Sequence, residues 1–276
     1  MSPPASGLAW TRYGEQGPPL VLLHGFAGNQ STWRFWTPEL AADHQVYTVD
    51  LKGFGDSPRP RDGRYAPADQ AALIDAWLEE RDLRDVTLVG HSLGGGVALL
   101  TALRLLDRGS ERVRRLVVVA GPAFPQPLPR FISMARVPLL GTLALHLLSP
   151  ERVIRMALSS IVFDPAGLTD TQVANYADPL GRPGGRYALL ESARQIVPTD
   201  LAQVVTRYPR LTQPTLLLWG RQDIVIPVGI GQRLAATLPR ARLEVLDRCG
   251  HVVPEERPEA SLALVRAFLA EHPLAR

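Results

Sequence analysis

Hydrophobic positions along this chain follow two patterns that alternate. Short, mainly apolar runs are typical of strands buried on both faces of a sheet. They occupy 20–23, 46–50, 86–89, 116–120, 215–219 and 243–246, and an edge strand is expected over 8–13. Helical spacing is found over 31–42, 66–81, 231–238 and 258–271, and in a segment that begins near 93. This alternation predicts an α/β fold, with a mostly parallel central sheet flanked by helices.

The alternation breaks at Gly121-Pro122 and resumes only at Thr215. Between these points, prolines recur and separate short apolar segments with helical spacing, and no segment reads as a convincing strand. This composition is typical of an inserted helical region. We therefore expect a core made of residues 1–121 and 210–276, and a helical cap over residues 122–209.

Composition narrows the class of protein. The chain has 276 residues, 46% of them hydrophobic, which is enough for one substantial core. Its formal charge of +3 comes from scattered arginines, since Lys52 is the only lysine, and this argues against nucleic acid as a partner. The lone cysteine, Cys249, excludes an internal disulfide.

The first residues lack the pattern of a signal peptide, and the longest apolar stretch, 137–148, is too short to span a bilayer. A cytoplasmic protein without a membrane span is expected.

The segment that organises the chain is Gly90-His91-Ser92-Leu93-Gly94, which lies between an apolar run and a helical segment. A G-x-S-x-G sequence in a sharp strand-to-helix turn holds its serine in a strained conformation that only small neighbours can flank. The serine hydroxyl then lies at a helix N-terminus, where unpaired N–H groups and the helix dipole favour negative charge. This arrangement suits a serine nucleophile.

The residues GHSLGG at 90–95 resemble the nucleophile elbow of the α/β-hydrolase superfamily. The loop His24-Gly25-Phe26-Ala27-Gly28 is similar to the superfamily's glycine-rich oxyanion loop, which follows a central strand. The resemblance implies an oxyanion hole made by the backbone N–H groups of Phe26 and Leu93, with a structural role for His24. It also implies a helical cap inserted after the sixth strand.

Two further positions match the superfamily's acid and base. Asp223 follows the strand at 215–219, and His251 lies in the loop before the last helix, so the order along the chain is Ser, Asp, His. We therefore predict a triad of Ser92, His251 and Asp223, which needs no cofactor and no metal. Asp223 is preferred to Asp247, which lies only four residues before His251.

A carboxylesterase that acts on a small-molecule ester is the expected function. Relatives that open epoxides or remove halogen use aspartate at the elbow, so Ser92 argues against both reactions. A C–C bond hydrolase of ring-cleavage products is the enzymatic alternative, although those enzymes commonly have Asn and Trp where this chain has His91 and Val252. A non-catalytic binding protein on the same fold is a third possibility. Oligomeric state is left open.

Two other patterns are interpreted as structural. The glycines of Gly53-Phe54-Gly55 lack the third glycine of a dinucleotide-binding loop, and Pro58 stands where a helix would open. Cys249 lies close to His251, but no elbow presents it, so a packed thiol is expected rather than a nucleophile.

Overall fold

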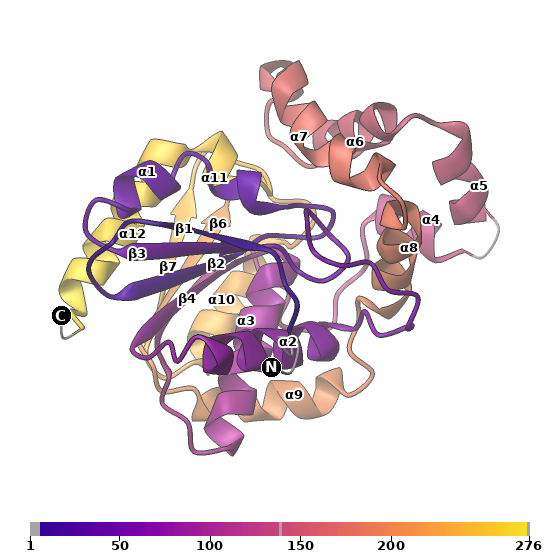
Figure 1. Ribbon diagram of the computed structural model, residues 1–276. Helices are drawn as coiled ribbons and strands as arrows, with labels where there is room; N and C mark the ends of the chain where they lie inside the picture. The colour runs from indigo at the N-terminus through magenta and orange to yellow at the C-terminus, as the bar shows by residue number, and fades with distance from the viewer. Residues whose placement is uncertain (1–5, 138–139, 275–276) are drawn as a thin grey trace.

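A seven-stranded sheet forms the centre of the computed structural model, which describes residues 6–137 and 140–274 (Figure 1). Its strand order is β1-β3-β2-β4-β5-β6-β7, and every neighbouring pair is parallel except β1 and β3. The strands are β1 Trp10–Tyr13, β2 Pro19–Leu23, β3 Gln45–Val49, β4 Val86–His91, β5 Val113–Val119, β6 Thr215–Gly220 and β7 Ala241–Leu246. The predicted fold class, a mostly parallel sheet flanked by helices, is confirmed.

Helices cover both faces of this sheet. The α-helices are α1 Thr37–Leu40, α2 Pro67–Glu80, α3 Leu93–Asp107, α4 Arg130–Arg136, α5 Leu140–Leu147, α6 Pro150–Ser159, α7 Asp170–Gly181, α8 Gly185–Gln195, α9 Leu201–Arg207, α10 Val228–Thr237, α11 Val253–Glu256 and α12 Pro258–Glu271. Short 3₁₀ turns are η1 Gln30–Trp33, η2 Pro165–Gly167 and η3 Tyr208–Arg210.

Strand β2 shows why the strands read as continuous apolar runs. Val21 and Leu23 pack in a core with residues of α2, α3 and α10, while Leu20 and Leu22 pack in a second core with residues of η1, α1 and α12. Successive side chains of a strand point to opposite faces, so a strand covered on both faces needs apolar residues at every position.

The helix expected over 31–42 is replaced by two short elements, η1 and α1. Pro38 lies in the first turn of α1. Proline has no backbone N–H and is tolerated in the first turn of a helix but not in its interior, so one continuous helix cannot run through this segment. The prediction was wrong here.

Between β5 and β6 the described residues form helices and turns without a strand. Five described strands precede this region, so it follows the fifth strand and not the sixth as the resemblance implied. The number of strands before the helical region is one lower than expected because the described chain before Pro19 forms a single strand, β1. In the view of Figure 1, α4 to α8 lie beyond one end of the sheet, and α9 is drawn apart from them.

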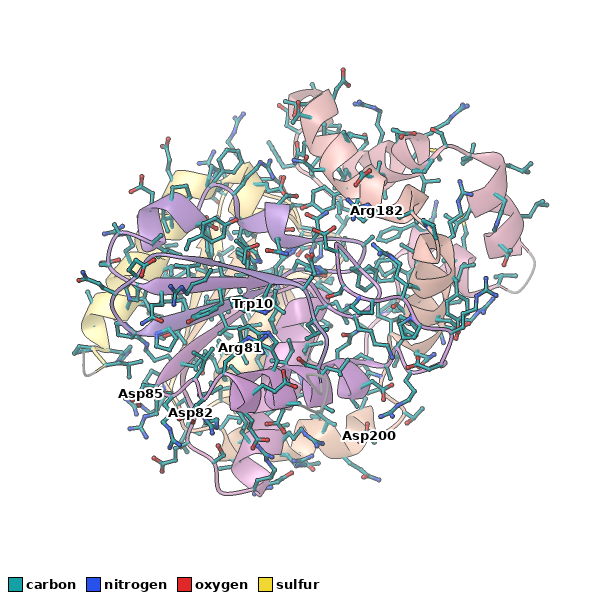
Figure 2. All side chains as sticks on the ribbon, viewed as in Figure 1. Trp10, Arg81, Asp82, Asp85, Arg182 and Asp200 are labelled. Atoms are coloured by element: carbon teal, nitrogen blue, oxygen red, sulfur yellow. The ribbon has the colours of Figure 1, made fainter. Side chains whose placement is uncertain are left out.

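Ion pairs join the helical region to the sheet domain at separate points. Arg182, which follows α7, pairs with Asp56 in the loop after β3, and Figure 2 shows Arg182 between the two parts. Arg207 of α9 pairs with Asp107, the last residue of α3. Among residues 6–137 and 140–274, no helix has both the length and the apolar composition to cross a bilayer.

Candidate active site

Ser92 lies between the end of β4 and the start of α3, with φ of +52°. Few non-glycine residues adopt this left-handed region, which marks a strained turn. The flanking glycines explain how the turn fits. A Cβ on Gly90 would lie 2.1 Å from the carbonyl oxygen of Gly94, and a Cβ on Gly94 would lie 2.3 Å from the carbonyl oxygen of Leu23. Only glycine leaves space at these two positions.

A continuous chain of hydrogen bonds joins three of the predicted residues. The Oγ of Ser92 lies 2.8 Å from Nε2 of His251, and Nδ1 of His251 lies 2.8 Å from Oδ2 of Asp223. His251 and Asp223 are buried. The structure therefore brings together side chains that are 159 and 28 positions apart in the sequence. An ionised carboxylate can accept hydrogen bonds but cannot donate them. Nδ1 of His251 therefore carries the proton toward Asp223, and Nε2 is left to accept from the serine hydroxyl.

Backbone groups fix the orientation of the Asp223 carboxylate. Its Oδ1 accepts hydrogen bonds from the N–H groups of Val225 at 2.8 Å and Ile226 at 3.0 Å, so Oδ2 is left to face His251. Asp247, the other aspartate near His251 in sequence, is not the partner of the imidazole. Its side chain is 71% exposed and pairs with Arg221.

The glycine-rich loop after β2 lies against Ser92. A Cβ on Gly25 would lie 3.0 Å from the Cβ of Ser92, so the loop approaches the serine closely. His24 is buried and binds backbone on both sides: Nδ1 donates to the carbonyl of Gly25 at 2.7 Å, and Nε2 accepts from the N–H of Leu51 at 3.0 Å. Burial lowers the pKa of His24, which favours this neutral form. These contacts agree with a structural role for His24.

The thiol of Cys249 is buried and lies 3.7 Å from the carbonyl oxygen of Gly250. Burial raises the pKa of this thiol, so its reactive thiolate form is suppressed near neutral pH. The structure thus places Cys249 in the packed environment that the sequence predicts.

The comparison with known families agrees with this arrangement. A family model described as the alpha/beta hydrolase fold matches residues 18–258. The chain belongs to the α/β-hydrolase fold family. This membership confirms the resemblance to the α/β-hydrolase superfamily that the sequence predicts.

Several relatives within this family are hydrolases. A 2-hydroxymuconate semialdehyde hydrolase of Pseudomonas sp. (strain CF600) is 31% identical over 262 residues, which cover 92% of this chain and 88% of the relative. Among solved structures, an alpha/beta hydrolase fold protein from Burkholderia ambifaria is 30% identical with a TM-score of 0.78, covering 94% of this chain and 93% of its own. A thermophilic esterase from Thermogutta terrifontis is 25% identical with a TM-score of 0.76, covering 96% and 93%. These relatives support a hydrolase, and two of them carry different activity names, a 2-hydroxymuconate semialdehyde hydrolase and an esterase.

Sequence reasoning missed two contributors to the site of this α/β-hydrolase. His91 donates from Nε2 to the carbonyl oxygen of His251 at 2.9 Å. Glu256, at the end of α11, accepts hydrogen bonds from the N–H groups of Gly250 and Val252, which flank His251. For Glu256 the only available signal was an acidic residue five positions after His251, just before the last helix.

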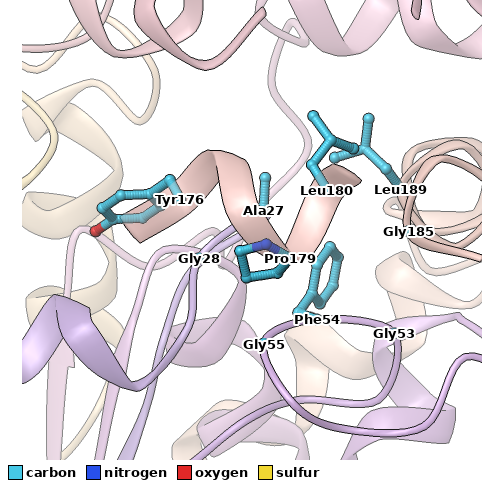
Figure 3. A pocket seen from close by; sticks show the side chains of 10 residues that line it. All are labelled: Ala27, Gly28, Gly53, Phe54, Gly55, Tyr176, Pro179, Leu180, Gly185 and Leu189. Carbon is cyan, nitrogen blue, oxygen red and sulfur yellow. The ribbon is translucent and has the colours of Figure 1, made fainter. Parts of the chain in front are cut away.

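A small hollow lies between the glycine-rich loop after β2 and the helical region (Figure 3). Ala27 and Phe54 line it from the sheet domain, and Tyr176, Leu180 and Leu189 line it from α7 and α8. Its volume of about 10 Å³ is close to that of a single water molecule. The hollow is therefore too small for a substrate as it stands.

The structure also describes the other motifs considered above. Gly53 and Gly55 lie in a turn after β3 and have positive φ, and a Cβ on Gly55 would collide with the carboxylate of Asp50. No helix opens directly after this turn, as the structural interpretation predicts. Within the part of the chain that the structure describes, no three His, Cys, Asp or Glu side chains gather as a metal-binding group.

Proposed function

We propose that this protein is a serine hydrolase that cleaves carboxylic esters through an acyl-enzyme on Ser92. One observation carries the proposal: the hydrogen bonds from Ser92 through His251 to Asp223, each 2.8 Å long. The family membership and the esterase from Thermogutta terrifontis among its structural relatives support it.

In the first step, Nε2 of His251 accepts the proton of the Ser92 hydroxyl as Oγ attacks the ester carbonyl. The resulting imidazolium is stabilised by the carboxylate of Asp223. His251 then gives the proton to the departing alkoxide, and the alcohol leaves. A water molecule, deprotonated by the same imidazole, attacks the acyl-enzyme. The bond between the acyl carbon and Oγ of Ser92 then breaks, His251 returns the proton to that oxygen, and the acid is released.

Negative charge develops on the carbonyl oxygen in both steps. The N–H of Leu93 lies in the first turn of α3, where helical N–H groups have no partner within the helix. The loop beside Ser92 carries the N–H of Phe26. We assign these two N–H groups to the oxyanion hole, where each such donor contributes roughly 3 kcal/mol of transition-state stabilisation.

The experiment that tests the proposal combines hydrolysis and labelling. We expect the protein to hydrolyse a chromogenic short-chain ester, and a serine-directed phosphonate to leave one adduct on the peptide that contains Ser92. Ser92→Ala should lose both properties. Equal labelling of Ser92→Ala would contradict the nucleophile assignment. Absence of turnover of both esters and ring-cleavage products, with ligand binding retained, would indicate a binding protein.

A C–C bond hydrolase of ring-cleavage products is the second candidate. The 31% identity to a 2-hydroxymuconate semialdehyde hydrolase favours it. His91 and Val252, which stand where such enzymes commonly have Asn and Trp, speak against it. Turnover of a ring-cleavage product with a kcat/KM far above that for simple esters would decide for this candidate.

A further inference from the structure

Glu256 lies where the sheet domain and the helical region meet. Its Oε2 accepts from the N–H of Gly250 at 2.9 Å and from the N–H of Phe163 at 2.7 Å, and its Oε1 accepts from the N–H of Val252 at 2.8 Å. Gly250 and Val252 flank His251, whereas Phe163 belongs to the segment after α6. One carboxylate therefore binds the backbone of two segments that are far apart in the sequence.

A second set of contacts joins the same two segments directly. The N–H of His251 donates to the carbonyl oxygen of Ile161 at 2.9 Å. A Cβ on Gly250 would lie 2.5 Å from that oxygen and 2.7 Å from the nitrogen of Phe163. The loop that carries His251 thus lies in backbone contact with residues 161–163, and Glu256 bonds to both sides of that contact.

Local capping accounts for only part of this arrangement. Val252 is the residue before α11, so its bond to Glu256 lies within one helical turn. The bonds from Gly250 and Phe163 lie outside that turn and join Glu256 to residues 6 and 93 positions earlier in the chain. Because a carboxylate oxygen has two lone pairs, Oε2 can accept from both N–H groups at once.

We propose that Glu256 is a positioning residue that holds the backbone of His251 in place and couples it to residues 161–163. The imidazole reaches Ser92 only when its backbone is fixed. A displacement of the 161–163 segment therefore moves the imidazole away from Ser92. The inference rests on the proposed function for its kinetic part, but the coupling itself does not depend on any activity.

The variant Glu256→Gln tests the coupling with almost no change of shape. Its amide has one accepting oxygen, and its NH₂ group cannot accept, so at least one of the three N–H groups loses its partner. In hydrogen exchange of the full chain, we expect amides of both 161–163 and 250–252 to exchange at least about tenfold faster than in the wild type. Glu259→Gln is the matched control, because it removes the same charge from an exposed position three residues away.

Kinetics test the positioning role. Loss of alignment of the general base should lower kcat by about 100-fold while KM changes little, since Glu256 acts through its bonds to backbone N–H groups. Faster exchange with an unchanged kcat would overturn the positioning role. Faster exchange in only one of the two segments would overturn the coupling.

Two further arms keep the tests separable. If Glu256→Gln does not fold, Glu256→Asp keeps both oxygens but shortens the side chain by one methylene, and the same two segments should exchange faster. Unchanged exchange in this variant would count against the inference. If the wild type hydrolyses no ester, the proposed function fails, while the exchange experiment still decides whether Glu256 couples the two segments.

Discussion

His91 donates a hydrogen bond from Nε2 to the carbonyl oxygen of His251 at 2.9 Å, and the two ring centroids lie 5.0 Å apart. His91, the neighbour of Ser92 in sequence, therefore holds the backbone of His251, whose imidazole faces Ser92. Burial, with a smaller contribution from the neighbouring His251, lowers the pKa of His91 to about 3. His91 therefore remains neutral near pH 7 and keeps the proton on Nε2.

This lowered pKa predicts acid sensitivity of the fold. The unfolded chain binds a proton on His91 near pH 6.5, whereas the folded protein does so only near pH 3. The contribution of His91 to the free energy of unfolding is thus fully present above pH 6.5 and falls as the pH drops through this window, by at most about 1.4 kcal/mol per pH unit. In His91→Asn this dependence should flatten. Urea unfolding at pH 7.5, 6 and 5 measures it, and identical slopes for variant and wild type would contradict the assignment.

The two aspartates near His251 should differ sharply in their effect on activity. Asp223→Asn leaves the geometry intact but no longer stabilises the imidazolium, so we expect kcat to fall by about 10³- to 10⁴-fold, as in other serine triads. Asp247→Asn removes only an exposed ion pair with Arg221 and should retain nearly full activity. Steady-state ester hydrolysis by both variants decides, and the reverse order of effects would move the acid to Asp247.

Cys249 should be dispensable and unreactive in the folded protein. Its thiol is buried and its pKa is raised, so an aromatic disulfide reagent should modify it only after denaturation. Cys249→Ala should keep most of the hydrolytic activity. Rapid modification of the native protein, accompanied by loss of activity, would instead indicate an accessible thiol at the site.

We also expect the helical region to set substrate preference as a cap. Val162 is partly buried and packs against the core that contains Leu93 and Val252, the neighbours of Ser92 and His251. Val162→Ala should shift the preference between acetate and octanoate esters by roughly 1 to 3 kcal/mol per methylene accommodated. Leu147→Ala, at a side chain 73% exposed on α5, is the control and should not shift it. An equal change for both esters in folded Val162→Ala would show that this side chain does not select among acyl chains.

The domain boundaries at residues 122 and 209 stay a prediction, and the structure suggests where to test the second one. Helix α9 is drawn apart from α4 to α8 in Figure 1, and its Arg207 pairs with Asp107 at the end of α3. A cap made of α4 to α8 would therefore end before Leu201. In limited proteolysis, we therefore expect the chain to be cut faster at residues 196–200 than near residue 209.

The sequence by itself determined the elements with local patterns. Continuous apolar runs identified the buried strands, because a sheet covered on both faces needs apolar residues at every position. The elbow was readable because Gly90 and Gly94 are required by contacts within a few residues or with the adjacent strand. The helical spacing over 31–42 was misleading, however, because Pro38 prevents one continuous helix and the segment forms η1 and α1 instead.

Only the tertiary structure decided how the loops meet. The contacts of Glu256 with Phe163 and of His91 with His251 join positions 93 and 160 residues apart. Loops have no hydrophobic period, so their sequence does not record which backbone groups they will face. The folded sheet brings the ends of β4, β6 and β7 to one edge, and buried N–H and C=O groups there must find partners, which selects these long-range hydrogen bonds.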